Sequence, residues 1–90
     1  MKQAEQHFGI TGAGSGIGRA IAVRLASEGA RLSLFGRRRE PLEETLSMVL
    51  SAGASQANWI QADVSDRQGI ERAFSESVDT LGLFRGIIAN

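Results

Sequence analysis

The stretch ITGAGSGIGRA, residues 10–20, places glycine at every second position from Gly12 to Gly18. Glycine loses more conformational entropy on folding than any other residue, so such a cluster needs a reason. Either the backbone turns with positive φ, or a partner approaches more closely than a Cβ allows. The apolar run HFGIT at residues 7–11 precedes the cluster and is typical of a buried strand, and residues 17–25 follow with helical periodicity. The sequence therefore predicts a strand, a glycine-rich turn and a helix in succession.

Three further short apolar runs are predicted to form strands. They are ARLSLFG at residues 30–36, NWIQADV at residues 58–64 and LFRGIIAN at residues 83–90. The sequence contains no internal repeat or low-complexity stretch that would indicate a second domain.

The segments between the strands carry apolar residues at helical spacing. The predicted apolar faces are Ile17, Ile21 and Leu25; Leu42, Leu46, Val49 and Leu50; and Ile70, Ala73, Phe74, Val78 and Leu81. Pro41 is predicted to occupy the first position of the second helix. Ser65 and Gln68 form the pattern of a capping box ahead of the third helix.

Strands and helices thus alternate in the order β-α-β-α-β-α-β. Because connections that contain a helix join parallel strands, and because parallel sheets are covered on both faces, the predicted fold class is α/β. The chain is expected to form one half of a doubly wound parallel sheet. One helix, around residues 70–81, is available for the second face, and the fourth strand is expected to leave its outer edge unpaired.

Composition limits the function classes. Ninety residues make one domain at most, and ten basic residues balance ten acidic ones, which gives no indication of a nucleic-acid partner. There is no cysteine, so disulfides and thiolate metal sites are excluded, and we expect no metal. No apolar run is long enough to span a membrane, and the start of the chain lacks the apolar run of a secretory signal. We therefore expect a cytoplasmic location and no membrane partner.

A glycine-rich turn between a strand and a helix is suited to binding an anion. The helix N-terminus offers unpaired N–H groups and the positive end of a dipole to a phosphate. The common G-x-G-x-x-G fingerprint fits no register here, because its last position falls on Ile17 or Arg19. The Walker pattern also fails, because no Lys-Ser or Lys-Thr pair follows the glycines.

The pattern that does fit is T-G-x-x-x-G-x-G, formed by Thr11, Gly12, Gly16 and Gly18. Right after an apolar strand, this spacing resembles the short-chain dehydrogenase/reductase family, whose members bind NAD or NADP in this turn. Three later segments, GRRREPLEE, ADVSD and IIAN, are similar to further family motifs and occur in the expected order. The resemblance covers about residues 7–90 and implies that residues 1–90 are the N-terminal part of a Rossmann-type dinucleotide-binding domain.

The resemblance implies a role for individual residues. Gly12 would make the tight turn that also contains Gly14, while Gly18 would let the helix pack closely. Ser15, Gly16 and Ile17 would lie along the pyrophosphate. Asp63 would accept a hydrogen bond from the adenine amino group beside the backbone of Val64, and Asn90 would lie by the nicotinamide-side ribose. Two alternatives remain open from the residues alone: Asp63 as a capping or turn residue, and Asn90 as the end of a strand.

Charge at the end of the second strand favours NADP over NAD. An acidic residue at this position normally accepts from the ribose 2′-OH of NAD, but Gly36 stands there and Arg37, Arg38 and Arg39 follow. A guanidinium suits a 2′-phosphate, with Arg37 as the first contact and Arg38 as the second. The alternative is a solvated start of a helix, with the arginines offset by nearby glutamates. NADP-preferring relatives often carry a second basic residue at the position that Ser15 occupies here.

The catalytic residues of the family are missing. Its hydride transfer uses a tyrosine, a lysine four residues later and a serine, but this sequence has no tyrosine and Lys2 is its only lysine.

Three hypotheses follow. The first is the cofactor-binding part of an NADP-dependent oxidoreductase acting on a carbonyl or alcohol, with a small-molecule substrate only if the chain continues; intact relatives are commonly dimers or tetramers. The second is a non-catalytic half-Rossmann module completed by a partner or by self-association, and the third is a structural remnant.

Overall fold

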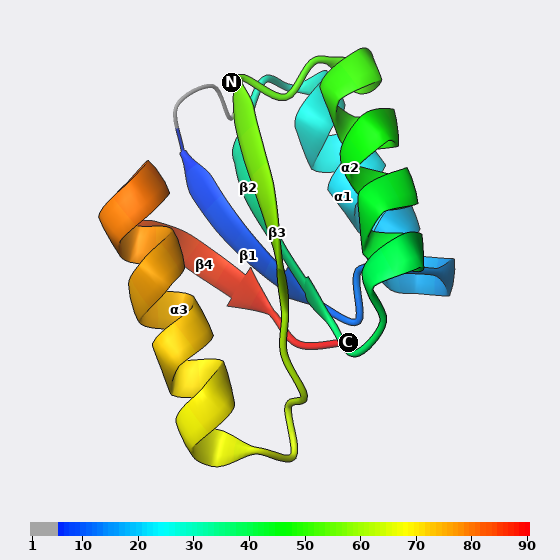
Figure 1. Ribbon diagram of the computed structural model, residues 1–90. Coiled ribbons are helices and arrows are strands. Elements are labelled where there is room, and N and C mark those ends of the chain that lie inside the picture. Colours follow the sequence, from blue (N-terminus) through cyan, green and yellow to red (C-terminus); the bar gives the residue numbers. More distant parts are fainter. Residues whose placement is uncertain (1–5) are drawn as a thin grey trace.

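The computed structural model describes residues 6–90, so the N-terminal segment with Lys2 lies outside the described residues. Strands and helices alternate along the chain as predicted (Figure 1). The elements are β1 (His7–Thr11), α1 (Gly16–Ser27), β2 (Arg31–Gly36), α2 (Arg39–Ala52), β3 (Gln56–Gln61), α3 (Arg67–Leu81) and β4 (Phe84–Ile88).

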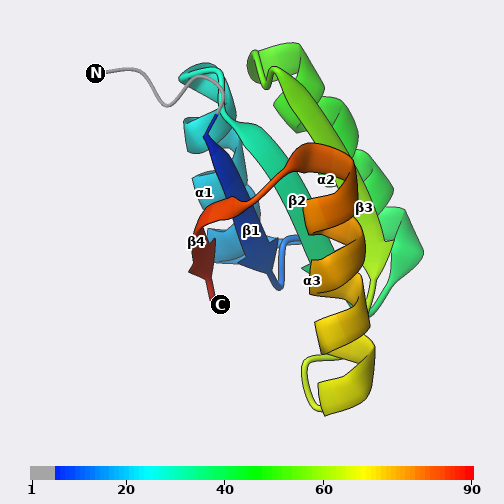
Figure 2. The ribbon, with the colours of Figure 1, turned by 90° about the vertical axis from the view of Figure 1, so that its left-hand side faces the viewer.

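The four strands form one parallel sheet in the order β3-β2-β1-β4. Helices α1 and α2 lie side by side on one face, and α3 lies on the other (Figures 1 and 2). This arrangement confirms the predicted half of a doubly wound Rossmann-type fold. Among the described strands β4 pairs only with β1, so its outer edge is unpaired, as expected. Because all strands run in the same direction, the loops that follow them gather at one edge of the sheet.

The third strand begins and ends earlier than predicted. It pairs with β2 from Arg31 opposite Gln56 to Gly36 opposite Gln61, and the ladder stops where β2 ends. The predicted range of 58–64 was therefore wrong at both ends. As a result, Asp63 and Val64 lie in the loop beyond the sheet and not within a strand.

Two helix starts also differ from prediction. Helix α2 begins at Arg39, so Pro41 occupies the third helical position; proline is tolerated there because the first N–H groups of a helix have no partner in the helix. The cap of α3 is Asp66, whose side chain accepts a hydrogen bond from the Gly69 N–H at 3.1 Å. The predicted cap, Ser65, instead donates its hydroxyl proton to Asp63.

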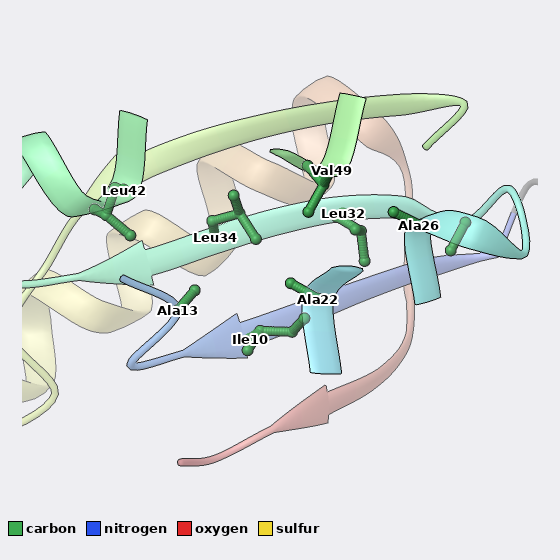
Figure 3. Packing of buried hydrophobic residues seen from close by; sticks show 9 residues of the cluster. Ile10, Ala13, Ala22, Ala26, Leu32, Leu34, Leu42 and Val49 are labelled. Atoms are coloured by element: carbon green, nitrogen blue, oxygen red, sulfur yellow. The ribbon is translucent and has the colours of Figure 1, made fainter. Parts of the chain in front are cut away.

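The main core lies between the sheet and the pair α1 and α2 (Figure 3). Ile10, Leu32 and Leu34 from the strands face Leu42 and Val49 from α2. The α1 side of this core is made of small residues, Gly18, Ala22 and Ala26, which allow the helix to lie close to the sheet.

Two residues assigned to apolar helix faces proved to be exposed. Ile17 is 70% exposed and Leu50 is 50% exposed. In α1 the buried row starts at Gly18 and not at Ile17, because the turn at residues 12–15, called the glycine turn, directs Gly18 toward the backbone of Gly12. In α2 the buried residues are Leu42, Thr45 and Val49, and Thr45 is a polar residue that an apolar pattern does not reveal.

The opposite face carries an aromatic cluster and a buried histidine. Phe35, Phe74 and Phe84 meet edge to face, with centroids 5.0 to 6.4 Å apart. His7 stacks on Phe84 at 4.4 Å, with its Nδ1 2.8 Å from the Gly82 carbonyl oxygen and its Nε2 2.7 Å from the Ser33 hydroxyl. Burial lowers the pKa of His7 below its ordinary value of 6.5, the carbonyl of Gly82 opposes this shift, and Arg31 adds to it.

Stability is expected to decrease as the pH falls through the range in which unfolded histidine becomes protonated. Because the pKa of His7 is lowered in the folded state, the unfolded chain binds more protons than the folded chain at pH values between that pKa and 6.5. The free energy of unfolding therefore keeps the full contribution of neutral His7 above pH 6.5 and declines below it. Urea unfolding, followed by the fluorescence of Trp59, measures this at neutral pH and at about pH 5.5. A His7→Gln variant should lose part of this dependence, and an equal slope in the variant would contradict the assignment.

Candidate functional site

The glycine turn is built by close backbone approaches. Gly12 has a φ of +62° and Gly16 a φ of +59°, both in the left-handed region that favours glycine. A Cβ on Gly18 would collide with the backbone carbonyl oxygen of Gly12. The N–H of Ala13 donates to the Phe35 carbonyl at 3.0 Å, which fixes the turn against β2. The turn therefore requires small residues for reasons that lie within the protein itself.

Gly14 faces the second helix. A Cβ on it would lie 2.8 Å from the Cβ of Pro41. The glycine turn thus packs directly on the first turn of α2, a contact between residues far apart in sequence. The structure therefore supplies a packing reason for Gly14 besides the cofactor contact predicted for it.

The N-terminus of α1 is available to an anion. Ser15 takes the N-cap position in extended conformation, and its side chain makes no capping hydrogen bond within the described residues. Ser15, Gly16 and Ile17 are all exposed, and no described atom lies within 4 Å of a Cβ built on Gly16. The first turn of α1 contains no acidic residue. Unpaired N–H groups and the positive dipole end therefore face solvent at this point.

A cavity of about 570 Å³ opens beside this helix N-terminus, at the carboxyl edge of the sheet. The predicted site residues that line it are Gly12, Gly14, Ser15, Arg37, Arg38, Val64 and Asn90. Gly16, Ile17 and Gly18 follow directly after Ser15 in α1 without lining the cavity themselves. Loops after all four strands thus contribute to one cavity.

Asn90 connects the fourth strand to the glycine turn. Its backbone N–H donates to the Thr11 hydroxyl at 3.0 Å, and its side-chain amide donates to the Gly12 carbonyl at 3.2 Å. Asn90 thus contributes to the geometry of the turn as well as to the cavity.

Asp63 lies apart from the other predicted residues. It lines a separate cavity of about 490 Å³ next to α3, to which Arg37 also contributes. Its Oδ1 accepts from the Ser65 N–H at 2.9 Å and from the Ser65 hydroxyl at 2.8 Å. These two bonds, with the N–H bond as the larger cause, lower the pKa of Asp63, and the charge of Arg37 adds to the shift. Asp63 therefore acts as a turn residue in this structure, and its adenine contact stays a prediction.

The arginines after β2 differ in their pairing. Arg39 forms an ion pair with Glu43 at 3.1 Å. The guanidinium groups of Arg37 and Arg38 make no ion pair or hydrogen bond within residues 6–90, and both residues are exposed at the rim of the larger cavity. The side-chain amide of Gln61 donates to the Arg37 carbonyl at 2.9 Å, which holds the backbone of this turn. Two cationic groups without an ion pair thus lie at the rim of the larger cavity, and Arg37 also borders the cavity of Asp63.

Sequence reasoning missed Arg19 and Thr45. Arg19 lines the larger cavity, and its Nε donates to the Thr45 hydroxyl at 2.8 Å. Thr45, fully buried, donates in turn to the Ala13 carbonyl at 2.8 Å. The sequence feature that could have identified Arg19 as a site residue is its position one helical turn after Ser15, which places both on the same side of α1.

Neither a metal cluster nor a spanning helix is found in the part of the chain that the structure describes. Within residues 6–90 no three His, Cys, Asp or Glu side chains lie together as potential metal ligands. In the same range no helix combines the length and the apolar character needed to cross a membrane.

Replacement of Gly18 by alanine is expected to destabilise the fold by about 1–3 kcal/mol, because the new Cβ meets a backbone oxygen that cannot move without opening the turn. Urea unfolding measures the loss. Ile17→Ala, one residue earlier and largely exposed, serves as the control and should change the free energy of unfolding by less than about 0.5 kcal/mol. Equal stability of Gly18→Ala and the wild type would refute the close approach of α1 to the turn.

Comparisons with known proteins agree with this fold. The profile of the short chain dehydrogenase family matches residues 6–90. Levodione reductase of Leifsonia aquatica is 43% identical over 82 residues, which cover 90% of this chain and 31% of that protein. The short-chain dehydrogenase/reductase homolog YusS of Bacillus subtilis is 37% identical over 82 residues, which cover 90% of this chain and 74% of that protein.

Solved structures superpose closely on the chain. A crystal structure of levodione reductase gives a TM-score of 0.90 at 39% identity, over 96% of this chain and 34% of that chain. NAD⁺-bound xylitol dehydrogenase gives a TM-score of 0.92 at 30% identity, over 97% of this chain and 33% of that chain. The chain thus spans about a third of the length of levodione reductase. Since the family profile matches nearly the whole chain, this protein belongs to the short-chain dehydrogenase family of oxidoreductases, which bind NAD(H) or NADP(H).

Proposed function

We propose that residues 1–90 form the cofactor-binding part of an oxidoreductase that transfers hydride between NADP(H) and a carbonyl or alcohol substrate. One observation carries the proposal: the glycine turn, the open N-terminus of α1, the two unpaired arginines, Val64 and Asn90 surround a single cavity. Such a cavity, at the carboxyl edge of a parallel sheet, is where α/β proteins bind dinucleotides.

The residues of the cavity, together with the neighbouring Gly16, Ile17 and Asp63, would meet the parts of a dinucleotide in order. Ser15, Gly16 and Ile17, at the positive end of α1, would hold the pyrophosphate through their N–H groups. Val64 and Asp63 would lie toward the adenine, and Asn90 toward the ribose on the nicotinamide side. When bound, the nicotinamide supplies the hydride chemistry. The described residues bind and orient the cofactor.

The preference for NADP rests on charge at the end of β2. Gly36 offers no carboxylate to a ribose 2′-OH, while the guanidinium groups of Arg37 and Arg38 make no ion pair or hydrogen bond within residues 6–90 at the rim of the cavity. A guanidinium binds phosphate through charge-assisted, bidentate hydrogen bonds, so a 2′-phosphate is favoured at this place over a hydroxyl.

We propose that the residues that carry out the reaction on the substrate lie outside these 90 residues. Without a tyrosine the 90 residues cannot supply the acid and base that the family uses, so we expect the chain alone to bind cofactor and to be inactive. The substrate would be engaged only in a longer protein, which we propose to be cytoplasmic and a homo-oligomer. The alternative, a module without chemistry, is not favoured by the similarity to levodione reductase and xylitol dehydrogenase, whose names are those of enzymes.

Arg37→Asp is expected to reverse the cofactor preference, because a carboxylate repels the 2′-phosphate and accepts from the 2′-OH. Titration of the chain with NADP⁺ and with NAD⁺ gives the two dissociation constants, and their ratio should move toward NAD⁺ by about tenfold or more. Arg67→Asp, an exposed arginine at the start of α3, is the matched control and should leave the ratio unchanged. An unchanged ratio in Arg37→Asp would remove the basis for the NADP assignment.

A further inference from the structure

We propose that Arg19 is a third residue of the 2′-phosphate site and helps to select NADP over NAD. The inference rests on the proposed function and deepens it. Arg19 belongs to α1, whereas Arg37 and Arg38 follow β2, yet all three line the same cavity. The guanidinium of Arg19 would therefore approach the phosphate from the side of the glycine turn.

Arg19 is held in place by contacts with α2. Its Nε donates to the Thr45 hydroxyl at 2.8 Å, and its Nη2 donates to the Pro41 carbonyl at 3.1 Å. Thr45 is itself fully buried. A guanidinium fixed in this way loses little further conformational entropy when it binds a ligand.

Part of the Arg19 guanidinium remains free for a ligand. The hydrogen bonds of Arg19 engage Nε and Nη2, while Nη1 has no partner within the described residues. The side chain is 26% exposed, so it is sheltered but accessible. Nη1 can thus donate two hydrogen bonds to an anion without breaking the contacts that position the group.

The charges around the cavity favour a dianion. Its basic lining residues are Arg19, Arg37 and Arg38, and its one acidic lining residue within residues 6–90 is Glu44. Glu44 pairs with Nη2 of Arg19 at 3.2 Å, but its side chain is 70% exposed. One carboxylate stands against three guanidinium groups, so it only partly offsets the positive charge of the cavity.

A purely structural role for Arg19 would have a different consequence. If Arg19 only joined α1 to α2, its removal would disturb the glycine turn through Thr45 and weaken both dinucleotides equally. A role at the 2′-phosphate weakens NADP⁺ alone, because NAD⁺ has a hydroxyl at that position. The ratio of the two dissociation constants therefore separates these roles.

The experiment measures the binding of NADP⁺ and NAD⁺ to the 90-residue chain and to four variants. Arg19→Gln removes the charge and should raise the dissociation constant for NADP⁺ by about tenfold while that for NAD⁺ stays within about twofold. Arg19→Lys keeps the charge and should recover part of the NADP⁺ affinity. Glu44→Gln removes the opposing carboxylate without touching Thr45, and should tighten NADP⁺ by about threefold. Glu40→Gln, an exposed glutamate of α2 that does not line the cavity, is the matched control and should change neither constant.

The outcomes are distinguishable. Loss confined to NADP⁺ in Arg19→Gln, with a gain in Glu44→Gln, supports the proposal. An equal loss for both dinucleotides, or no change in either variant, overturns it and leaves Arg19 as a structural contact, even where the chain binds NADP⁺ well. If Arg19→Gln does not fold, Glu44→Gln alone decides, because an unchanged NADP⁺ affinity there contradicts the charge argument. Wild-type chain that binds neither dinucleotide overturns the proposed function, and this inference with it.

Discussion

The close approach of Gly18 to the carbonyl of Gly12 is the constraint on which the site depends. A helix that starts this near the end of β1 must have no side chain at the point of contact, and the structure leaves no room for one. The same carbonyl also accepts from the side chain of Asn90, so the turn, α1 and the segment after β4 meet at one oxygen atom. The position of the N-terminus of α1, where we propose that the pyrophosphate binds, therefore follows from backbone packing inside the protein.

A second set of contacts relates the glycine turn to Arg37 and Arg38, which follow β2. Gly14 packs on Pro41, and the buried hydroxyl of Thr45 joins the Ala13 carbonyl to α2. These contacts determine where α2 begins relative to α1, and hence where Arg37 and Arg38 lie relative to the N-terminus of α1. The separation between the proposed pyrophosphate site and the proposed 2′-phosphate site would thus be set by a few residues that are small or buried.

Much of this could be predicted from the sequence because apolar periodicity and glycine act locally. The β1 strand, the alternation of elements and the parallel sheet follow from short apolar runs separated by helical segments. The predictions were wrong where tertiary contacts determine which residue is buried or caps a helix. Ile17 is apolar but exposed, since the turn directs Gly18 inward; the cap of α3 moved to Asp66 because Ser65 bonds Asp63. The hydrogen bonds of Thr45 with Arg19 and Ala13 could not be predicted, because the bonded residues lie more than twenty positions apart in the sequence.

The most direct test of the account is an NMR titration of the chain with NADP⁺, followed through the backbone amide signals. We expect the changes to concentrate in the glycine turn and the first turn of α1, at Arg37 and Arg38, and at Asn90, all of which lie at the carboxyl edge of the sheet. Saturable changes confined to the outer surface of α3, or no change at any amide, would contradict a dinucleotide site at the glycine turn.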